Sequence, residues 1–71
     1  MEFALCGDYI ELDNLLKASG IAASGAEARD LIRQGLILVN GEKESRLRRK
    51  IRKGDKVAAG RILLEIISSV V

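Results

Sequence analysis

The chain has 71 residues, a formal net charge of +2, one cysteine, and no histidine, tryptophan or proline. A chain this short forms one domain at most and cannot enclose a deep substrate pocket in a conventional enzyme core. The lone Cys6 excludes an internal disulfide and a cysteine-based metal site, and no apolar run approaches the ~20 residues of a membrane span. Without a signal peptide, this composition favours a reducing cytoplasm and predicts no membrane association, metal or cofactor.

The charges are distributed unevenly along the chain. Residues 1–28 carry one basic and five acidic side chains, residues 29–56 carry ten basic and four acidic ones, and residues 57–71 carry one of each sign. Because residues 29–56 are basic and residues 1–28 are acidic, we expect one basic face on the folded protein. Such a face favours a polyanionic partner but says little about the fold.

The first third of the chain predicts a short strand and then a helix. Phe3-Ala4-Leu5 is a brief apolar stretch that suits an edge strand. Leu12, Leu15 and Leu16 then recur at helical spacing, which predicts a first helix with one apolar face. Gly20 is placed to end this helix.

A second helix is predicted to begin at Ser24, whose hydroxyl can accept a hydrogen bond from the backbone N–H three residues later. Ala28, Leu31 and Ile32 then share the apolar face of this helix. Arg29 and Arg33 are one turn apart, so they share another face. Two helices joined by so short a connection resemble a helix–turn–helix hairpin.

Strands and turns make up the remainder of the chain. Leu36–Val39 is a short apolar strand, and Asn40-Gly41 is a strong signal for a hairpin turn. We expect residues 42–45 to return as a strand and residues 56–67 to form a last hairpin, whose weak alternation indicates two partly covered faces. The predicted fold is α+β, a two-helix hairpin packed on a small, mostly antiparallel β-sheet, in one domain over residues 1–71.

The main candidate for ligand binding is the basic segment, residues 46–53, with the sequence RLRRKIRK. Leu47 and Ile51 interrupt its charges and can fix it to the core, which an unanchored basic tail would not need. A charged run is more often a solvated loop. Here the charge density, the two apolar anchors and the acidic first part of the chain favour phosphate binding. The affinity would come from the release of counterions and would fall as the salt concentration rises. The basic residues are Arg46, Arg48, Arg49, Lys50, Arg52 and Lys53.

Four further residues are candidates with plainer alternatives. Arg29 and Arg33 are explained equally well by pairing with surface carboxylates, which contributes little. Lys43, just after the turn, either borders the basic face or is an ordinary exposed lysine. We interpret Ser24 first as a helix cap, and phosphate binding at the helix N-terminus is the second, less favoured interpretation.

The scarcity of aromatic residues narrows the class of ligand. Only Phe3 and Tyr9 carry rings, which argues against modules that stack single-stranded bases and favours backbone and shape recognition of structured RNA. A DNA-binding helix–turn–helix ranks last, because Ala26, Glu27 and Asp30 are poor base-reading residues for a recognition helix. A protein-interaction adaptor that docks its basic strip on an acidic partner stays open as the alternative.

The pattern as a whole resembles a known family. Leu12-Asp13 with Leu16, followed by SGAEARDLIRQGLILVNG, is similar to the alpha-L RNA-binding module named after small-subunit ribosomal protein S four, most of all to its small stand-alone bacterial members of the YbcJ type. The similarity covers about Ile10 to Val57. It implies a two-helix hairpin on a small sheet that binds structured RNA, often ribosomal or transfer RNA, and the lack of an accompanying catalytic domain argues against an enzyme.

Carried over residue by residue, the resemblance places the RNA-facing surface at Ser24, Arg29, Arg33 and Lys43. Gly25 stands where many relatives have an arginine, and Glu11 stands where many have a basic residue, so more weight falls on the basic segment. We therefore predict a monomeric, non-catalytic, cytoplasmic RNA-binding protein, linked to ribosome assembly or translation. Its expected partner is ribosomal or transfer RNA, with the ribosome itself as a further candidate.

Overall fold

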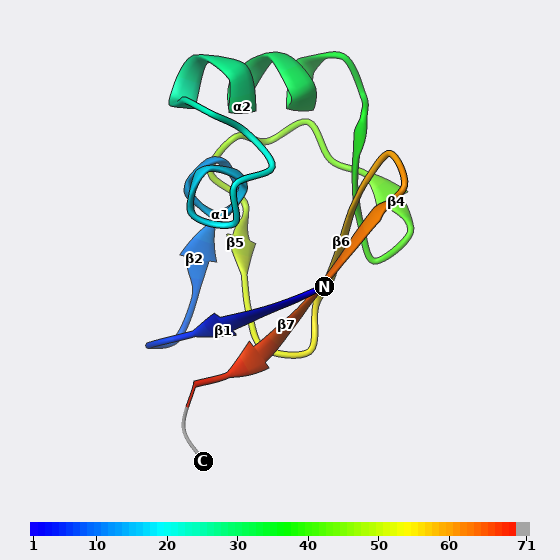
Figure 1. The fold of residues 1–71 in the computed structure, drawn as a ribbon. Helices are drawn as coiled ribbons and strands as arrows, with labels where there is room; N and C mark the ends of the chain where they lie inside the picture. Colours follow the sequence, from blue (N-terminus) through cyan, green and yellow to red (C-terminus); the bar gives the residue numbers. More distant parts are fainter. Residues whose placement is uncertain (70–71) are drawn as a thin grey trace.

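The computed structural model describes residues 1–69. Within this range the chain forms two helices, α1 (Leu12–Ala18) and α2 (Gly25–Arg33). The larger β-sheet has the strand order β1 (Glu2–Leu5), β7 (Ile62–Ser68), β6 (Lys56–Ala59), β3 (Ile37–Val39) and β4 (Glu42–Lys43). The smaller sheet is a ribbon of two strands, β2 (Ile10–Glu11) and β5 (Lys50–Ile51). Figure 1 shows both helices to one side of strands β3, β4 and β6.

The strand pairing confirms the predicted mostly antiparallel sheet. Strand β1 lies at an edge, as predicted, and it pairs with β7 in parallel, with Phe3 opposite Ile66. The other pairs in both sheets are antiparallel. The return strand β4 is shorter than the predicted 42–45, because the chain leaves the sheet after the N–H of Glu44 donates to the carbonyl of Ile37.

The turn between β3 and β4 confirms the hairpin prediction. Asn40 and Gly41 both have positive φ, at 52° and 86°, which is the conformation of a type I′ turn. The side chain of Asn40 also donates to Asp55 Oδ1 at 3.0 Å and accepts from the backbone N–H of Lys56 at 2.9 Å. This asparagine therefore ties the hairpin to the turn that precedes β6.

The second helix also begins as the sequence predicts. The hydroxyl of Ser24 accepts a hydrogen bond from the N–H of Glu27 at 3.2 Å, so it caps the first turn of α2. Gly35, with φ +74°, follows the helix in the left-handed conformation. The apolar face of α2 carries the buried residues Ala28 and Ile32.

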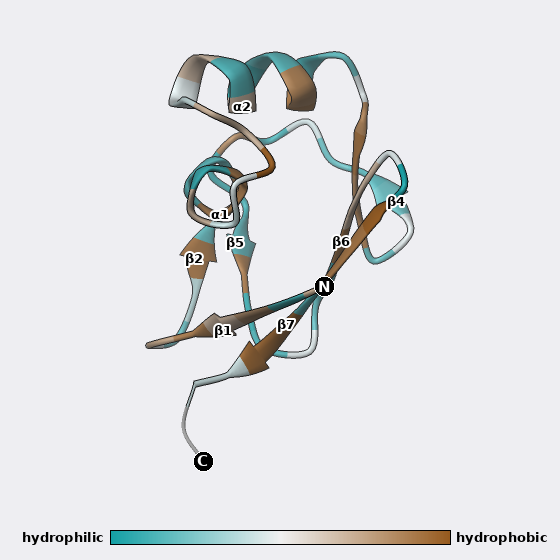
Figure 2. Ribbon diagram, in the orientation of Figure 1, coloured by the Kyte–Doolittle hydropathy of each residue, from teal (hydrophilic) through white to brown (hydrophobic). Residues whose placement is uncertain are grey.

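The core lies between the helices and the larger sheet. Its largest fully buried side chains come from both helices and four strands, and they are Leu12, Leu15, Leu16, Ile32, Ile37, Ile51, Val57 and Leu64. Figure 2 shows apolar β7 in brown, while the segment between β4 and β5 is mostly teal. The hydrocarbon core and the charged surface are thus built from different parts of the chain.

The two faces of the last strand are covered unequally. Along β7, Leu64 and Ile66 are buried, but Leu63 and Ile67 are 48% and 36% exposed. Alternation is regular only in the middle of the strand, since Ile62 is also 42% exposed, and the outer face is covered less than the face toward the core. Val70 and Val71 lie outside the described residues. Neither helix in residues 1–69 is long and apolar enough to cross a membrane.

Candidate nucleic-acid interface

The backbone of the basic segment caps helix α1. The N-cap residue of this helix, Glu11, makes no side-chain cap bond. Instead, the N–H of Leu12 donates to the carbonyl of Arg49 at 2.9 Å, and the N–H of Asp13 donates to the carbonyl of Leu47 at 3.0 Å. The first N–H groups of a helix have no partner within it, so these two bonds satisfy donors that need an outside acceptor. The basic segment is therefore fixed to the start of α1.

Two apolar side chains hold the same segment from the inside. Ile51 is fully buried and pairs with Ile10 across the β2–β5 ribbon. Leu47 is half-buried and packs against the core. The prediction that these two residues anchor the basic segment is confirmed. Its charged side chains consequently project from an ordered backbone and not from a loose loop.

A carboxylate that the sequence did not single out orients two of the arginines. Glu44 is only 6% exposed. Its Oε1 accepts from Arg46 Nη2 at 3.1 Å and from Arg49 Nη1 at 2.7 Å. Its Oε2 accepts from Arg46 Nε at 3.1 Å and from the backbone N–H of Arg46 at 3.0 Å. One buried carboxylate thus sets the direction of two guanidinium groups.

These contacts keep Glu44 ionised. The side-chain hydrogen bonds from Arg46 are the largest cause of a lowered pKa, helped by the backbone N–H of Arg46 and by the side chain of Arg49, while burial acts in the opposite direction. Together they lower the pKa of Glu44 from 4.5 to about 2. No periodic pattern marks this residue, since a glutamate two positions before a basic run reads as an ordinary surface charge.

Most of the basic segment faces one surface. A depression of about 500 Å³ is lined by four of its residues, Arg46, Arg48, Arg49 and Lys50. The side chain of Arg46 is 71% exposed and that of Arg49 is 31% exposed, so both remain accessible beside Glu44. A concave surface lined by cations raises the local concentration of anionic groups. It suits the phosphates of a nucleic acid.

The last two cations of the segment lie beyond this depression, and one of them is close to an aromatic ring. Arg52 and Lys53 are exposed. The guanidinium carbon of Arg52 lies 5.8 Å from the centre of the Tyr9 ring, and the ammonium of Lys50 lies 4.9 Å from it. In the sequence Tyr9 stands out only as one of two aromatic residues, because no local pattern connects it to residues 50–52.

Of the residues predicted on and after the second helix, only Ser24 lies at the N-terminal end of α2. Arg29 and Arg33 are exposed on α2 and form no ion pair within residues 1–69. Lys43 passes over Gly35, with its Cδ 3.7 Å from where a β-carbon would stand there, so it lies just past the C-terminal end of α2. Ser24 caps the other end of α2, about 13 Å away for nine residues of helix.

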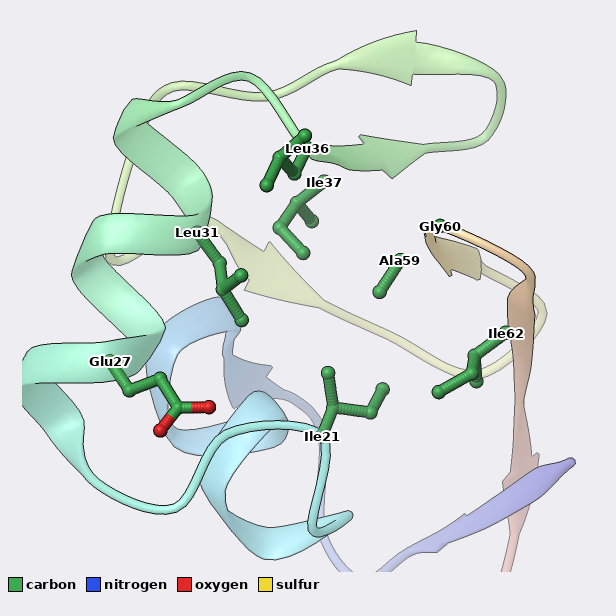
Figure 3. A pocket seen from close by; sticks show the side chains of 8 residues that line it. All are labelled: Ile21, Glu27, Leu31, Leu36, Ile37, Ala59, Gly60 and Ile62. Carbon is green, nitrogen blue, oxygen red and sulfur yellow. The ribbon is translucent and has the colours of Figure 1, made fainter.

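A second depression, of about 300 Å³, has the opposite chemistry. Figure 3 shows hydrocarbon side chains around it, with Glu27 at one side. Glu27 and Leu31 of α2 line it. Arg29 and Arg33 lie two positions further on, about 200° around the helix, so they point to the other side of α2. This depression does not suit phosphate. The remaining lining residues are Ile21, Leu36, Ile37, Ala59, Gly60 and Ile62.

A two-helix hairpin on a small, mostly antiparallel sheet is the alpha-L fold, as the resemblance in the sequence predicted. The family model described as the S4 domain matches residues 3–67. The chain belongs to the S4 domain family.

Individual relatives agree with this assignment. Over 64 residues the chain is 41% identical to the small ribosomal subunit protein uS4 of Acidithiobacillus ferrooxidans, which covers 86% of this chain but 31% of that protein. Over 50 residues it is 42% identical to YbcJ of Escherichia coli, covering 70% and 71% of the two chains. The chain spans about a third of the length of the ribosomal relatives it matches.

A solved structure agrees as well. The solution structure of YbcJ from Escherichia coli superposes with a TM-score of 0.73 at 34% identity, covering 94% of this chain and 86% of that one. That structure is described as revealing an alpha-L motif involved in RNA binding.

Proposed function

We propose that this protein is a non-catalytic RNA-binding protein that holds the phosphates of structured RNA with its basic segment. One observation carries the proposal: four cations of this segment line a single depression, on a backbone held by α1, by β2 and by the core. Because the backbone is ordered, binding costs less conformational entropy than it would for a loose tail. The family, and the RNA binding described for YbcJ, support the same reading.

The six cations have unequal roles. Arg48, Lys50, Arg52 and Lys53 are exposed and make no ion pair within residues 1–69. Arg46 and Arg49 share the charge of Glu44, but each guanidinium has five N–H donors. Arg46 uses two of them for Glu44 and Arg49 uses one. Both arginines therefore keep donors for phosphate, in a direction that Glu44 has set.

Residues of α2 and β4 supply a second contact. Arg29, Arg33 and Lys43 would orient the RNA, and Ser24 would contribute only through the start of the helix. The similarity to uS4 favours ribosomal RNA, or a transfer RNA, as the partner, and a role of a cytoplasmic monomer in ribosome assembly or translation. An adaptor that docks on an acidic protein is the alternative that the test must separate.

The test measures fluorescence anisotropy with a labelled ribosomal stem-loop RNA and a duplex DNA of the same sequence, each at two salt concentrations. The variant replaces Arg48, Arg49 and Lys50, three of the four cations that line the depression, by glutamine. The matched control replaces Lys17, Lys56 and Arg61 by glutamine, which removes the same charge from exposed positions outside the segment. Circular dichroism verifies that both variants fold.

We expect the wild type to bind RNA more tightly than DNA. The segment variant should bind RNA at least about tenfold more weakly, with a salt slope smaller by about 2–3 for three lost phosphate contacts. The control should retain most of the affinity. Equal RNA binding by the folded variant would remove the basic segment from the mechanism. Displacement of the RNA by polyglutamate at matched charge concentration would favour the adaptor.

A further inference from the structure

The outer face of the β2–β5 ribbon carries an aromatic ring among cations. Ile10 pairs with Ile51 and Glu11 pairs with Lys50. Continuing this antiparallel register places Tyr9 opposite Arg52. Side chains alternate between the two faces of a strand, so Ile10 and Ile51 point to the core. The outward face then carries Tyr9, Glu11, Lys50 and Arg52.

The ring is accessible and lies close to both cations of this face. Tyr9 is 44% exposed. The ammonium of Lys50 lies 4.9 Å from the ring centre, and the guanidinium carbon of Arg52 lies 5.8 Å from it. Both side chains are long and exposed, so they can move to the edge of the ring without disturbing the core. Lys50 also lines the basic depression, which makes the ring continuous with that surface.

We propose that Tyr9 is a stacking platform for one unpaired base of the bound RNA, while Lys50 and Arg52 hold the phosphates beside that base. This proposal rests on the proposed function and adds a recognition element to it. A nucleotide combines an anionic phosphate with a flat π-face, and the ribbon offers cations and a ring within one side-chain length. Base–aromatic stacking is a recurring contact with single-stranded nucleotides.

The geometry also indicates which RNA would use the ring. Bases inside a continuous duplex are stacked on each other and cannot reach a protein side chain, whereas bases of loops and bulges can. Glu11 faces Lys50 on the same surface. Its carboxylate disfavours a phosphate on its side of the ribbon and so directs the backbone toward Arg52. The predicted ligand is a stem with a bulged or loop nucleotide.

The chain provides its own probe, because Tyr9 is its single tyrosine and it has no tryptophan. Tyrosine emission therefore reports on this ring alone. The experiment titrates the full chain with two RNA stems that differ only in one bulged adenosine. It follows the tyrosine emission of the protein and the fluorescence anisotropy of labelled RNA, and the second signal also reports on variants without tyrosine. Tyr9→Leu removes the ring. Tyr9→Phe is the matched control, since it keeps the ring and removes only the hydroxyl.

We expect the bulged stem to quench tyrosine emission and the paired stem to leave it nearly unchanged. Tyr9→Leu should weaken binding of the bulged stem about tenfold, within the range for loss of one base–aromatic stack, and should change binding of the paired stem less than about twofold. Tyr9→Phe should bind both stems like the wild type.

Several results would overturn the stacking role. Equal weakening on both stems in Tyr9→Leu would mean that the ring acts only by holding Lys50 and Arg52. Equal wild-type affinity and equal quenching on both stems would exclude the bulge preference while leaving RNA binding intact. Failure of the wild type to bind either stem would refute the proposed function, and the stacking role with it.

Discussion

The contact between Glu44 and its two arginines makes a prediction about acid stability. Replacing Glu44 by glutamine keeps the size of the side chain but removes its charge and turns one oxygen into an NH₂ donor. That donor would face guanidinium groups, which accept no hydrogen bonds. We expect the variant to be less stable than the wild type at pH 7, because two arginines lose their shared carboxylate.

The magnitude follows from the lowered pKa. A change from 4.5 to about 2 corresponds to about 3 kcal/mol at about 1.4 kcal/mol per pKa unit. Glu44 itself is covered, but the side chain of Arg46 is 71% exposed, so solvent screens the cluster. We therefore expect about 1–2 kcal/mol in practice. In a domain of this size each kcal/mol lowers the Tm by about 4–8 °C.

The pH dependence has a defined sign. A carboxyl whose pKa is lower in the folded state stabilises the fold fully above its unfolded value of 4.5, and this contribution is lost as the pH falls toward about 2. Thermal unfolding followed by circular dichroism, at steps from pH 7 to pH 2.5, compares the wild type with Glu44→Gln. The difference in stability should shrink steadily below about pH 5. Glu42→Gln, at an exposed carboxylate in neighbouring β4, is the control. A difference that stays constant with pH, or is absent at pH 7, would refute the argument.

Substitutions at three further residues, Ile51, Asn40 and Ser24, test other contacts of the fold. Ile51→Val should cost about 0.5–1.5 kcal/mol in urea unfolding, whereas Ile62→Val, at a residue 42% exposed, should cost much less; equal costs would contradict the anchoring role. Asn40→Gly keeps the turn conformation but loses two side-chain hydrogen bonds. Asn40→Ala loses the same bonds and also strains the positive φ at this position. The free energy of unfolding should therefore fall by about 1 kcal/mol from Asn to Gly and by about 1 kcal/mol more from Gly to Ala. Ser24→Ala should cost about 1 kcal/mol and change RNA affinity less than about twofold; a large loss of affinity without loss of stability would assign Ser24 to the RNA contact.

Much of the local structure could be predicted because short-range chemistry decides it. The start of α2 depends on a hydroxyl and an N–H three residues apart, and the turn depends on two adjacent residues that tolerate positive φ. Leu47 and Ile51 could be recognised as anchors because two apolar residues within a charged run have little reason to be solvated. The amount of positive charge in residues 46–53 was equally visible. Its use in binding RNA stays a prediction.

The arrangement of the candidate interface was decided by tertiary contacts. Carbonyl groups of residues 47 and 49 cap a helix that begins more than thirty positions earlier, and Tyr9 meets Lys50 and Arg52 only through the β2–β5 pairing. Glu44 becomes a buried partner because the chain leaves the sheet there and folds its arginines back over it. None of these has a periodic or adjacent signal, since each joins groups that packing alone brings together. Composition thus determined that the protein has a basic surface, and the fold determined which cations share it, in which direction they point, and which ring stands beside them.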